Sequence, residues 1–166
     1  MARFAVSFIL LFLHVATLTQ EDQLKAFDPF LNKTWQIEGK WGNAMDFKQE
    51  TTFRKALEGN LIIAESKGYI NEGQTQWGDR NHGIRRYDAE AQKLKFYEYD
   101  VFGGFTEGEI TIEGKDLLYI YTYEGQTICD KWEYVNENEY KYIVGTYGNG
   151  RIQLVLLEGK AKVKND

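Results

Sequence analysis

Nine clusters of turn-forming residues divide the chain into ten short segments, and this punctuation is the feature that most restricts the possible folds. Gly, Asn and Asp recur in the clusters because they tolerate a positive φ angle or hydrogen-bond to their own backbone, as tight hairpin loops require. The clusters lie at positions 42–43, 58–60, 71–73, 88–90, 103–104, 113–115, 124–125, 136–138 and 148–150. Short segments joined by short turns predict an antiparallel meander of ten strands.

The segments themselves have the composition and the periodicity of strands. They are rich in Tyr, Phe, Trp, Ile, Val and Thr, and several alternate between two unlike faces. Trp35 and Ile37 share a face in the first segment, and Ile128, Asp130 and Trp132 share a face in the eighth. A period of two is the signature of a strand whose two faces meet different surroundings.

A closed barrel accommodates ten consecutive antiparallel strands best. An open sheet would leave two exposed edges, and closure removes them. A sandwich needs Greek-key crossovers and longer connections than those between the clusters. The one Pro of the chain, Pro29, precedes the first strand, and the stretch 22–31 around it has room for one or two helical turns. The predicted fold is therefore all-β: a ten-stranded antiparallel up-and-down closed β-barrel with a short N-terminal helix.

The first twenty residues have the layout of a secretory signal peptide. Arg3 precedes an apolar run over 4–15, and a few small or polar residues follow before Glu21. The run is too short to span a bilayer, although a retained N-terminal anchor is the alternative interpretation. We therefore expect a signal peptide over residues 1–20, a single barrel domain over 21–166, a secreted or periplasmic location, and no stable membrane insertion once the signal is removed.

Composition excludes several classes of function. The net charge is −5 and no basic run stands out, so nucleic acid is not an expected partner. Cys129 has no second Cys to pair with, so we expect it to be a buried free thiol. The only His after the signal peptide is His82, far from Cys129 in sequence, and no stretch has the pattern of a calcium loop. We therefore expect no metal site.

The segment Leu31-Asn32-Lys33-Thr34-Trp35 resembles the opening of a calycin barrel. Lipocalins and fatty-acid-binding proteins carry Gly-x-Trp there, and the indole closes one end of the barrel. Trp35 matches this Trp, and Lys33 stands in the Gly position. The resemblance implies a calycin-like barrel with Trp35 as its structural plug.

From about residue 31 to about residue 159, the chain more closely resembles a family of secreted bacterial lipocalin-like proteins of unknown function. In that family a segment ends in Arg-x-Tyr-Asp, seen here as Arg85-Arg86-Tyr87-Asp88, and an aromatic strand with a Gly-containing turn follows, seen here at 96–104.

Two departures from calycin relatives bear on function. Fatty-acid-binding proteins insert a helix pair between the first two strands and lipocalins have a long loop there, whereas this chain has only the turn at 42–43. The stretch 22–31 is therefore the expected cover of the cavity mouth. Haem-binding relatives with a ten-stranded barrel use a His near the C-terminus, and this chain would need His82 or a Tyr instead, so no cofactor is expected.

Arg85 and Tyr87 are candidates for ligand binding because they share a strand face. In fatty-acid-binding proteins an Arg-x-Tyr pair holds the ligand carboxylate, since a guanidinium fork matches two oxygens and the phenol adds a donor. Arg86 lies on the opposite face and competes for the inward position. An Arg held inside by Glu98 across the hairpin is the alternative interpretation.

The Tyr and Trp side chains also indicate a pocket. Tyr offers an apolar ring and a hydroxyl that needs a partner, which suits a cavity for a ligand of mixed polarity. Rows of Tyr that face outward and stiffen the sheet are the alternative. The candidate ligand-binding residues are Arg85, Tyr87, Phe96, Glu98, Tyr121 and Trp132.

The leading functional hypothesis is an exported binding protein that encloses a small hydrophobic or amphipathic molecule. In one form of this hypothesis the ligand is anionic. The alternative is a small barrel enzyme, an isomerase or a hydrolase, that uses the interior carboxylates Glu98 or Asp100 as acid and base. Serine hydrolase chemistry is not expected, because Ser66 is the only Ser after the signal peptide. A third hypothesis is a filled barrel that acts through its outer surface. Two observations separate these hypotheses: the volume of the barrel interior, and which of the side chains of Arg85 and Arg86 points into it.

Overall fold

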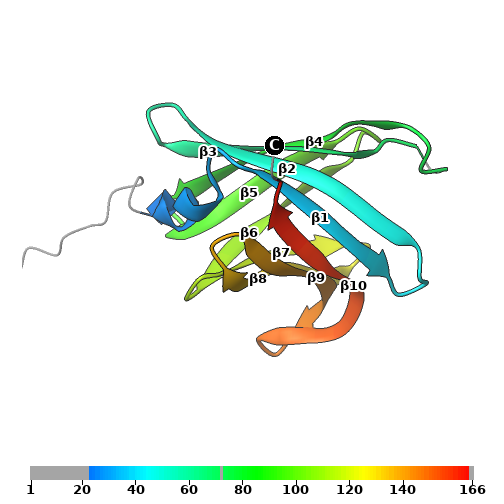
Figure 1. Ribbon diagram of the computed structural model, residues 1–166. Coiled ribbons are helices and arrows are strands. Elements are labelled where there is room, and N and C mark those ends of the chain that lie inside the picture. The colour runs from blue at the N-terminus through cyan, green and yellow to red at the C-terminus, as the bar shows by residue number, and fades with distance from the viewer. Residues whose placement is uncertain (1–22, 72, 165–166) are drawn as a thin grey trace, which may run out of the picture.

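The computed structural model describes residues 23–71 and 73–164, so the expected signal peptide at 1–20 lies outside the described residues. Ten antiparallel strands form a closed barrel in which each strand pairs with its neighbours in sequence and β1 pairs with β10 (Figure 1). The elements in chain order are η1 (Lys25–Phe30), β1 (Thr34–Trp41), β2 (Asp46–Ala56), β3 (Leu61–Tyr69), β4 (Trp77–Asp88), β5 (Lys93–Asp100), β6 (Phe105–Glu113), β7 (Asp116–Tyr123), β8 (Gln126–Asn136), β9 (Glu139–Gly148) and β10 (Arg151–Val163).

The observed connections confirm the predicted meander. Each of the nine turn clusters falls at a connection between consecutive strands. Residues with positive φ gather in these connections, among them Gly59, Gly103, Gly125 and Gly150. The short N-terminal helix is also confirmed, as one 3-10 helix over Lys25–Phe30.

Aromatic packing fills one end of the barrel. Trp35 is completely buried, and its indole N–H donates a hydrogen bond to the backbone carbonyl of Phe30 at 3.2 Å. The Phe30 ring lies 5.5 Å from Trp35, 5.5 Å from Trp132 and 4.8 Å from Tyr140, measured between ring centroids. Phe30 belongs to η1, so this helix and Trp35 together close the barrel at the end where β1 begins.

The position of η1 corrects one expectation. The sequence predicts that the stretch 22–31 covers the mouth of the cavity, but η1 packs into the opposite end, away from the β1–β2 hairpin turn (Figure 1). Leu24, Phe27 and Phe30 are buried in the main hydrophobic cluster. Apolar side chains at this spacing act as part of the core, so η1 forms the base of the barrel.

A β-bulge interrupts the pairing of β3 with β4. Ser66 pairs with Asn81 and Lys67 pairs with Asp79, so Arg80 is the extra residue on β4. A bulge re-aims the side chain that it adds. Arg80 consequently joins Asn81 on the inner side of the barrel, where both line the cavity.

No described helix has the length and apolar character needed to cross a lipid bilayer.

Candidate functional site

The barrel encloses a cavity of about 240 Å³. Its lining extends from Phe53 and Trp132, which pack against Phe30 of η1, to Trp41 and Tyr123 beside the β1–β2 and β7–β8 turns. The cavity therefore opens at the end opposite η1. A cavity of this size removes the main support for the hypothesis of a filled barrel.

Five of the six candidate residues come together at this cavity: Arg85, Phe96, Glu98, Tyr121 and Trp132. Tyr87 does not belong to the described lining; it lies further along β4 toward the η1 end and packs against the hydrophobic cluster. The Arg-x-Tyr pair of the resemblance is thus divided between the cavity and the core.

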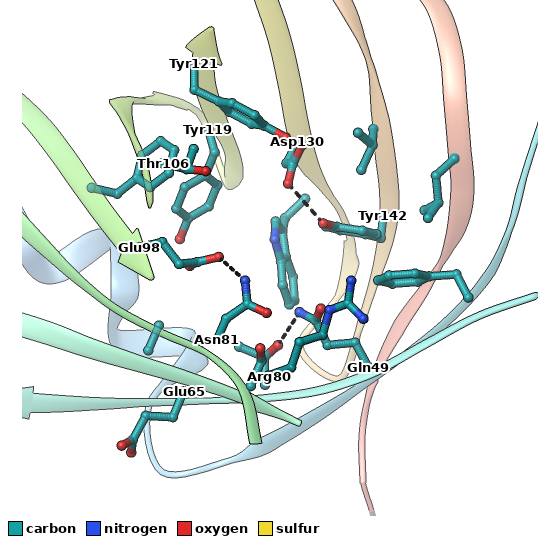
Figure 2. A pocket seen from close by; sticks show the side chains of 18 of the residues that line it. Gln49, Glu65, Arg80, Asn81, Glu98, Thr106, Tyr119, Tyr121, Asp130 and Tyr142 are labelled. Atoms are coloured by element: carbon teal, nitrogen blue, oxygen red, sulfur yellow. Dashed lines mark hydrogen bonds between the residues drawn. The ribbon is translucent and has the colours of Figure 1, made fainter. Parts of the chain in front are cut away.

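Arg85 is the inward Arg of β4, and Arg86 is exposed. Nη2 of Arg85 donates to Oε2 of Glu98 at 2.6 Å, and the Arg85 side chain is only 7% exposed. Asn81 Nδ2 donates to the other carboxylate oxygen at 2.8 Å (Figure 2). The guanidinium also lies over the rings of Phe96 and Tyr119, 5.7 and 5.3 Å from their centroids. The alternative of an Arg held by Glu98 across the hairpin is therefore what the structure shows.

Asp130 forms a second polar group on the opposite wall. The hydroxyl of Tyr121 donates to Oδ1 at 3.0 Å and that of Tyr142 donates to Oδ2 at 3.1 Å (Figure 2). Burial raises the pKa of the Asp130 carboxyl to about 7, and the two hydroxyl donors oppose that rise only in part. Burial likewise raises the pKa of both tyrosines, so they remain neutral donors at neutral pH.

Several polar atoms of the cavity wall are buried and lack a hydrogen-bond partner of acceptable geometry among the described residues. They are the hydroxyl oxygens of Ser66 and Tyr119, Oδ1 of Asn81, and Nε and Nη1 of Arg85. A buried polar atom without a partner costs about 1–3 kcal/mol.

Tyr residues of β7 and β9 face inward, which decides between the two interpretations of the Tyr rows. Tyr119, Tyr121 and Tyr123 of β7 and Tyr142 of β9 line the cavity. The alternative of outward rows is wrong for these residues. Their rings supply apolar surface, and their hydroxyls supply the polar groups described above.

Asp100 has a different role from the one that the enzyme hypothesis gave it. Its Oδ1 accepts hydrogen bonds from the backbone N–H groups of Phe102 and Gly104, each at 2.8 Å. The side chain therefore holds the β5–β6 turn, and it does not belong to the described cavity lining. An acid or base role inside the cavity does not fit this position.

His82 and Cys129 both point away from the cavity. His82 is exposed on the outer surface, with Nδ1 3.2 Å from the Glu65 carboxylate. Cys129 is a buried free thiol on the outer face of β8, and burial raises its pKa to about 12. Within 23–71 and 73–164, no group of three or more His, Cys, Asp or Glu side chains gathers in a way that would hold a metal ion.

Arg80, Asn81, Asp130 and Tyr142 are among the lining residues that the sequence-based selection left out. Asp130 had a usable signal, since it alternates with Ile128 and Trp132 and is the polar member of an otherwise apolar face. Arg80 had none, because the bulge breaks the period of two and shifts it to the inner face.

The S-type phycobiliprotein lyase CPES from Guillardia theta is similar to this chain in structure. The two are 11% identical, with a TM-score of 0.52 over 89% of this chain and 94% of that chain. A redesigned β-barrel is 12% identical, with a TM-score of 0.45 over 84% of this chain and 96% of that chain. No protein-family model and no curated protein matches the sequence. The likeness to the lyase agrees with the closed β-barrel fold that the sequence predicts.

Proposed function

We propose that this protein is an exported binding protein that holds one small, partly aromatic molecule inside its barrel. The observation that carries the proposal is an aromatic cavity whose wall also holds buried polar groups, the Arg85–Glu98 pair and the Asp130 carboxyl. A barrel that served only as a scaffold would be more stable with apolar side chains at these positions. A ligand that hydrogen-bonds there explains why polar groups occupy them.

The cavity limits the size of the ligand. Its volume of about 240 Å³ lies just below the range of about 300–1,000 Å³ typical of drug-sized ligands. A single ring with short polar arms fits this space.

The rim of the mouth suits a partly hydrophobic ligand. Large apolar side chains are exposed at or beside the connections at this end: Met45, Val101, Phe102 and Tyr123. An apolar surface around a cavity entrance favours the approach of apolar molecules, because contact there releases water from both surfaces.

Export is the part of the proposal that rests on the sequence. The charged start, apolar run and polar end of residues 1–20 support it. Expression with a periplasmic or extracellular readout tests it: the mature protein should appear outside the cytoplasm with its first residue near position 21. Retention of the full-length chain in the cytoplasm or the membrane contradicts it.

Binding is tested with a variant that fills the cavity. We predict that at least one of three probes, phenethylamine, 2-phenylethanol or phenylacetate, raises the melting temperature of the wild-type protein. Ser66→Phe should abolish the rise, because Ser66 lines the cavity and is buried. Lys67→Phe is the matched control, since Lys67 is the next residue on β3 and its side chain is 61% exposed on the outer face. No rise with any probe, or an equal rise in Ser66→Phe, contradicts the proposal.

Acid–base catalysis is a second candidate function, and the Asp130 carboxyl is the observation that favours it. A group whose pKa is about 7 both accepts and donates protons near neutral pH, and this one faces a cavity. Asp130 replaces Asp100 as the carboxyl of that hypothesis, with Glu98 fixed in its ion pair. If a substrate screen finds turnover, Asp130→Asn should abolish it; turnover that survives this change excludes Asp130 as the acid or base.

A further inference from the structure

Asp130 is a buried carboxyl without a cation. No described Lys, Arg or His lies within 4.0 Å of it. Of the two guanidinium groups that line the cavity, Arg85 is 2.6 Å from Glu98, and Arg80 donates to the backbone carbonyl of Tyr69. Buried carboxylates are ordinarily paired with a cation, because hydrogen bonds alone do not replace the lost hydration. A positively charged group placed at this wall of the cavity would therefore stabilise the carboxylate.

The carboxyl is deep in the barrel yet open to the cavity. Asp130 retains partial exposure although neighbouring Ile128 and Trp132 are buried, and it lines the cavity. Figure 2 shows its carboxyl group facing the central space, flanked by the side chains of Tyr121 and Tyr142. A ligand atom in that space can reach the carboxyl oxygens beside the tyrosine hydroxyls.

Aromatic rings surround the same wall. Trp132 lies 5.6 Å from Tyr142, and Phe47 stacks on Tyr142 with centroids 6.1 Å apart. Tyr121 adds a further ring on the β7 side. Aromatic faces attract cations through the ring quadrupole, most strongly where water is excluded. A carboxyl set among such rings is the chemistry that recognises an ammonium group.

We infer that the Asp130 wall, with Tyr121, Tyr142 and Trp132, is a subsite for the protonated amine of a small aromatic ligand. This inference rests on the proposed binding function and specifies its ligand class. An N–H of the ammonium donates to a carboxylate oxygen of Asp130, and the ring of the ligand lies among the cavity aromatics. Glu98 already balances the positive charge of Arg85, so this guanidinium offers little net attraction to an anionic ligand.

Proton linkage gives the subsite a characteristic pH dependence. The groups that face Asp130 are Tyr121 on β7, Tyr142 on β9, and the Glu98–Arg85 pair from β5 and β4. In the protein without a ligand, the pKa of the Asp130 carboxyl is about 7. An amine that binds the carboxylate at lower pH must therefore displace a proton. Amine affinity should fall about tenfold for each pH unit below about 7, and a neutral ligand should show no such fall.

The test compares three matched probes by isothermal titration calorimetry with the full mature protein at about pH 8. Phenethylamine, 2-phenylethanol and phenylacetate share a phenyl ring and differ in the charge of the arm. We expect phenethylamine to bind about tenfold or more tightly than the other two. Asp130→Asn should remove this preference. Asp79→Asn is the control and should keep it, because the side chain of Asp79 is 93% exposed.

The possible outcomes separate this inference from the proposed function. If 2-phenylethanol or phenylacetate binds the wild-type protein as tightly as phenethylamine, the amine subsite is wrong while the binding function stands. If none of the three binds, the binding function fails and the subsite with it. Should Asp130→Asn prove unfolded by circular dichroism, the pH dependence of phenethylamine binding to the wild-type protein decides: a flat profile between about pH 5 and 8 overturns the inference.

Discussion

At Asp130, burial and two tyrosine hydroxyls act in opposite directions on one carboxyl group. Burial is the larger effect and raises the pKa from 3.8 to about 7. In the unfolded chain the group ionises at its ordinary pKa. Between about pH 4 and pH 7, the Asp130 carboxyl is therefore neutral in the folded protein and ionised in the unfolded chain. The neutral form stabilises the native state at low pH, and this contribution disappears as the pH rises through the folded-state pKa.

We predict that the wild-type protein loses stability relative to Asp130→Asn as the pH rises from about 4 to about 7. The relative loss should be on the order of a few kcal/mol, because the folded state retains a proton that the unfolded state releases over this range. Urea unfolding of both proteins across the range measures it. A difference that stays constant with pH, or that changes in the opposite direction, contradicts the raised pKa.

At the scale of elements, the barrel closes where β1 and β10 approach each other at two glycines. Gly39 pairs with Gly159, and a Cβ added to Gly39 would lie 2.5 Å from the backbone oxygen of Glu158 and 2.8 Å from Cα of Gly159. Real Cβ atoms do not come that close to backbone, so a side chain here forces the strands apart. The pair of glycines permits the contact that joins the first strand to the last.

Gly39→Ala should destabilise the protein by about 1–3 kcal/mol, the usual cost of forcing atoms into a packed site. Gly42→Ala is the control, because a Cβ there meets nothing nearer than 3.7 Å. Thermal or urea unfolding of the two variants measures the difference. Equal stabilities would show that β1 and β10 tolerate a side chain at their crossing.

The strands also show which parts of the site the sequence predicts. Local signals sufficed for the ten strands and for the inward face of β8, because turn residues and a period of two are encoded by adjacent residues. The inward position of Arg80 depends on pairing with β3, where the bulge appears. The contact of Asp130 with Tyr142 depends on the register of β8 with β9. Tyr87 matches a sequence resemblance, but in the fold it is half-buried and packs against the hydrophobic cluster instead of lining the cavity.

At the scale of the whole molecule, the barrel has one closed end and one open end. η1 and Trp35 fill the first, and the cavity with its Arg85–Glu98 pair and its Asp130 group opens toward the second. The four Trp residues of the chain lie at different places in the barrel. Trp35 lies in the plug, Trp132 on the cavity wall, Trp41 near the mouth, and Trp77 at the start of β4, 40% exposed.

The four indole N–H signals in a nitrogen–proton NMR spectrum therefore test the central claim, that a small molecule binds inside the barrel. On titration with phenethylamine, 2-phenylethanol and phenylacetate in turn, we predict that at least one probe shifts the signals of Trp132 and Trp41. The signal of Trp77 should stay in place, because this residue does not belong to the described cavity lining. Shifts confined to Trp77, or no shift with any probe, would contradict binding in the cavity.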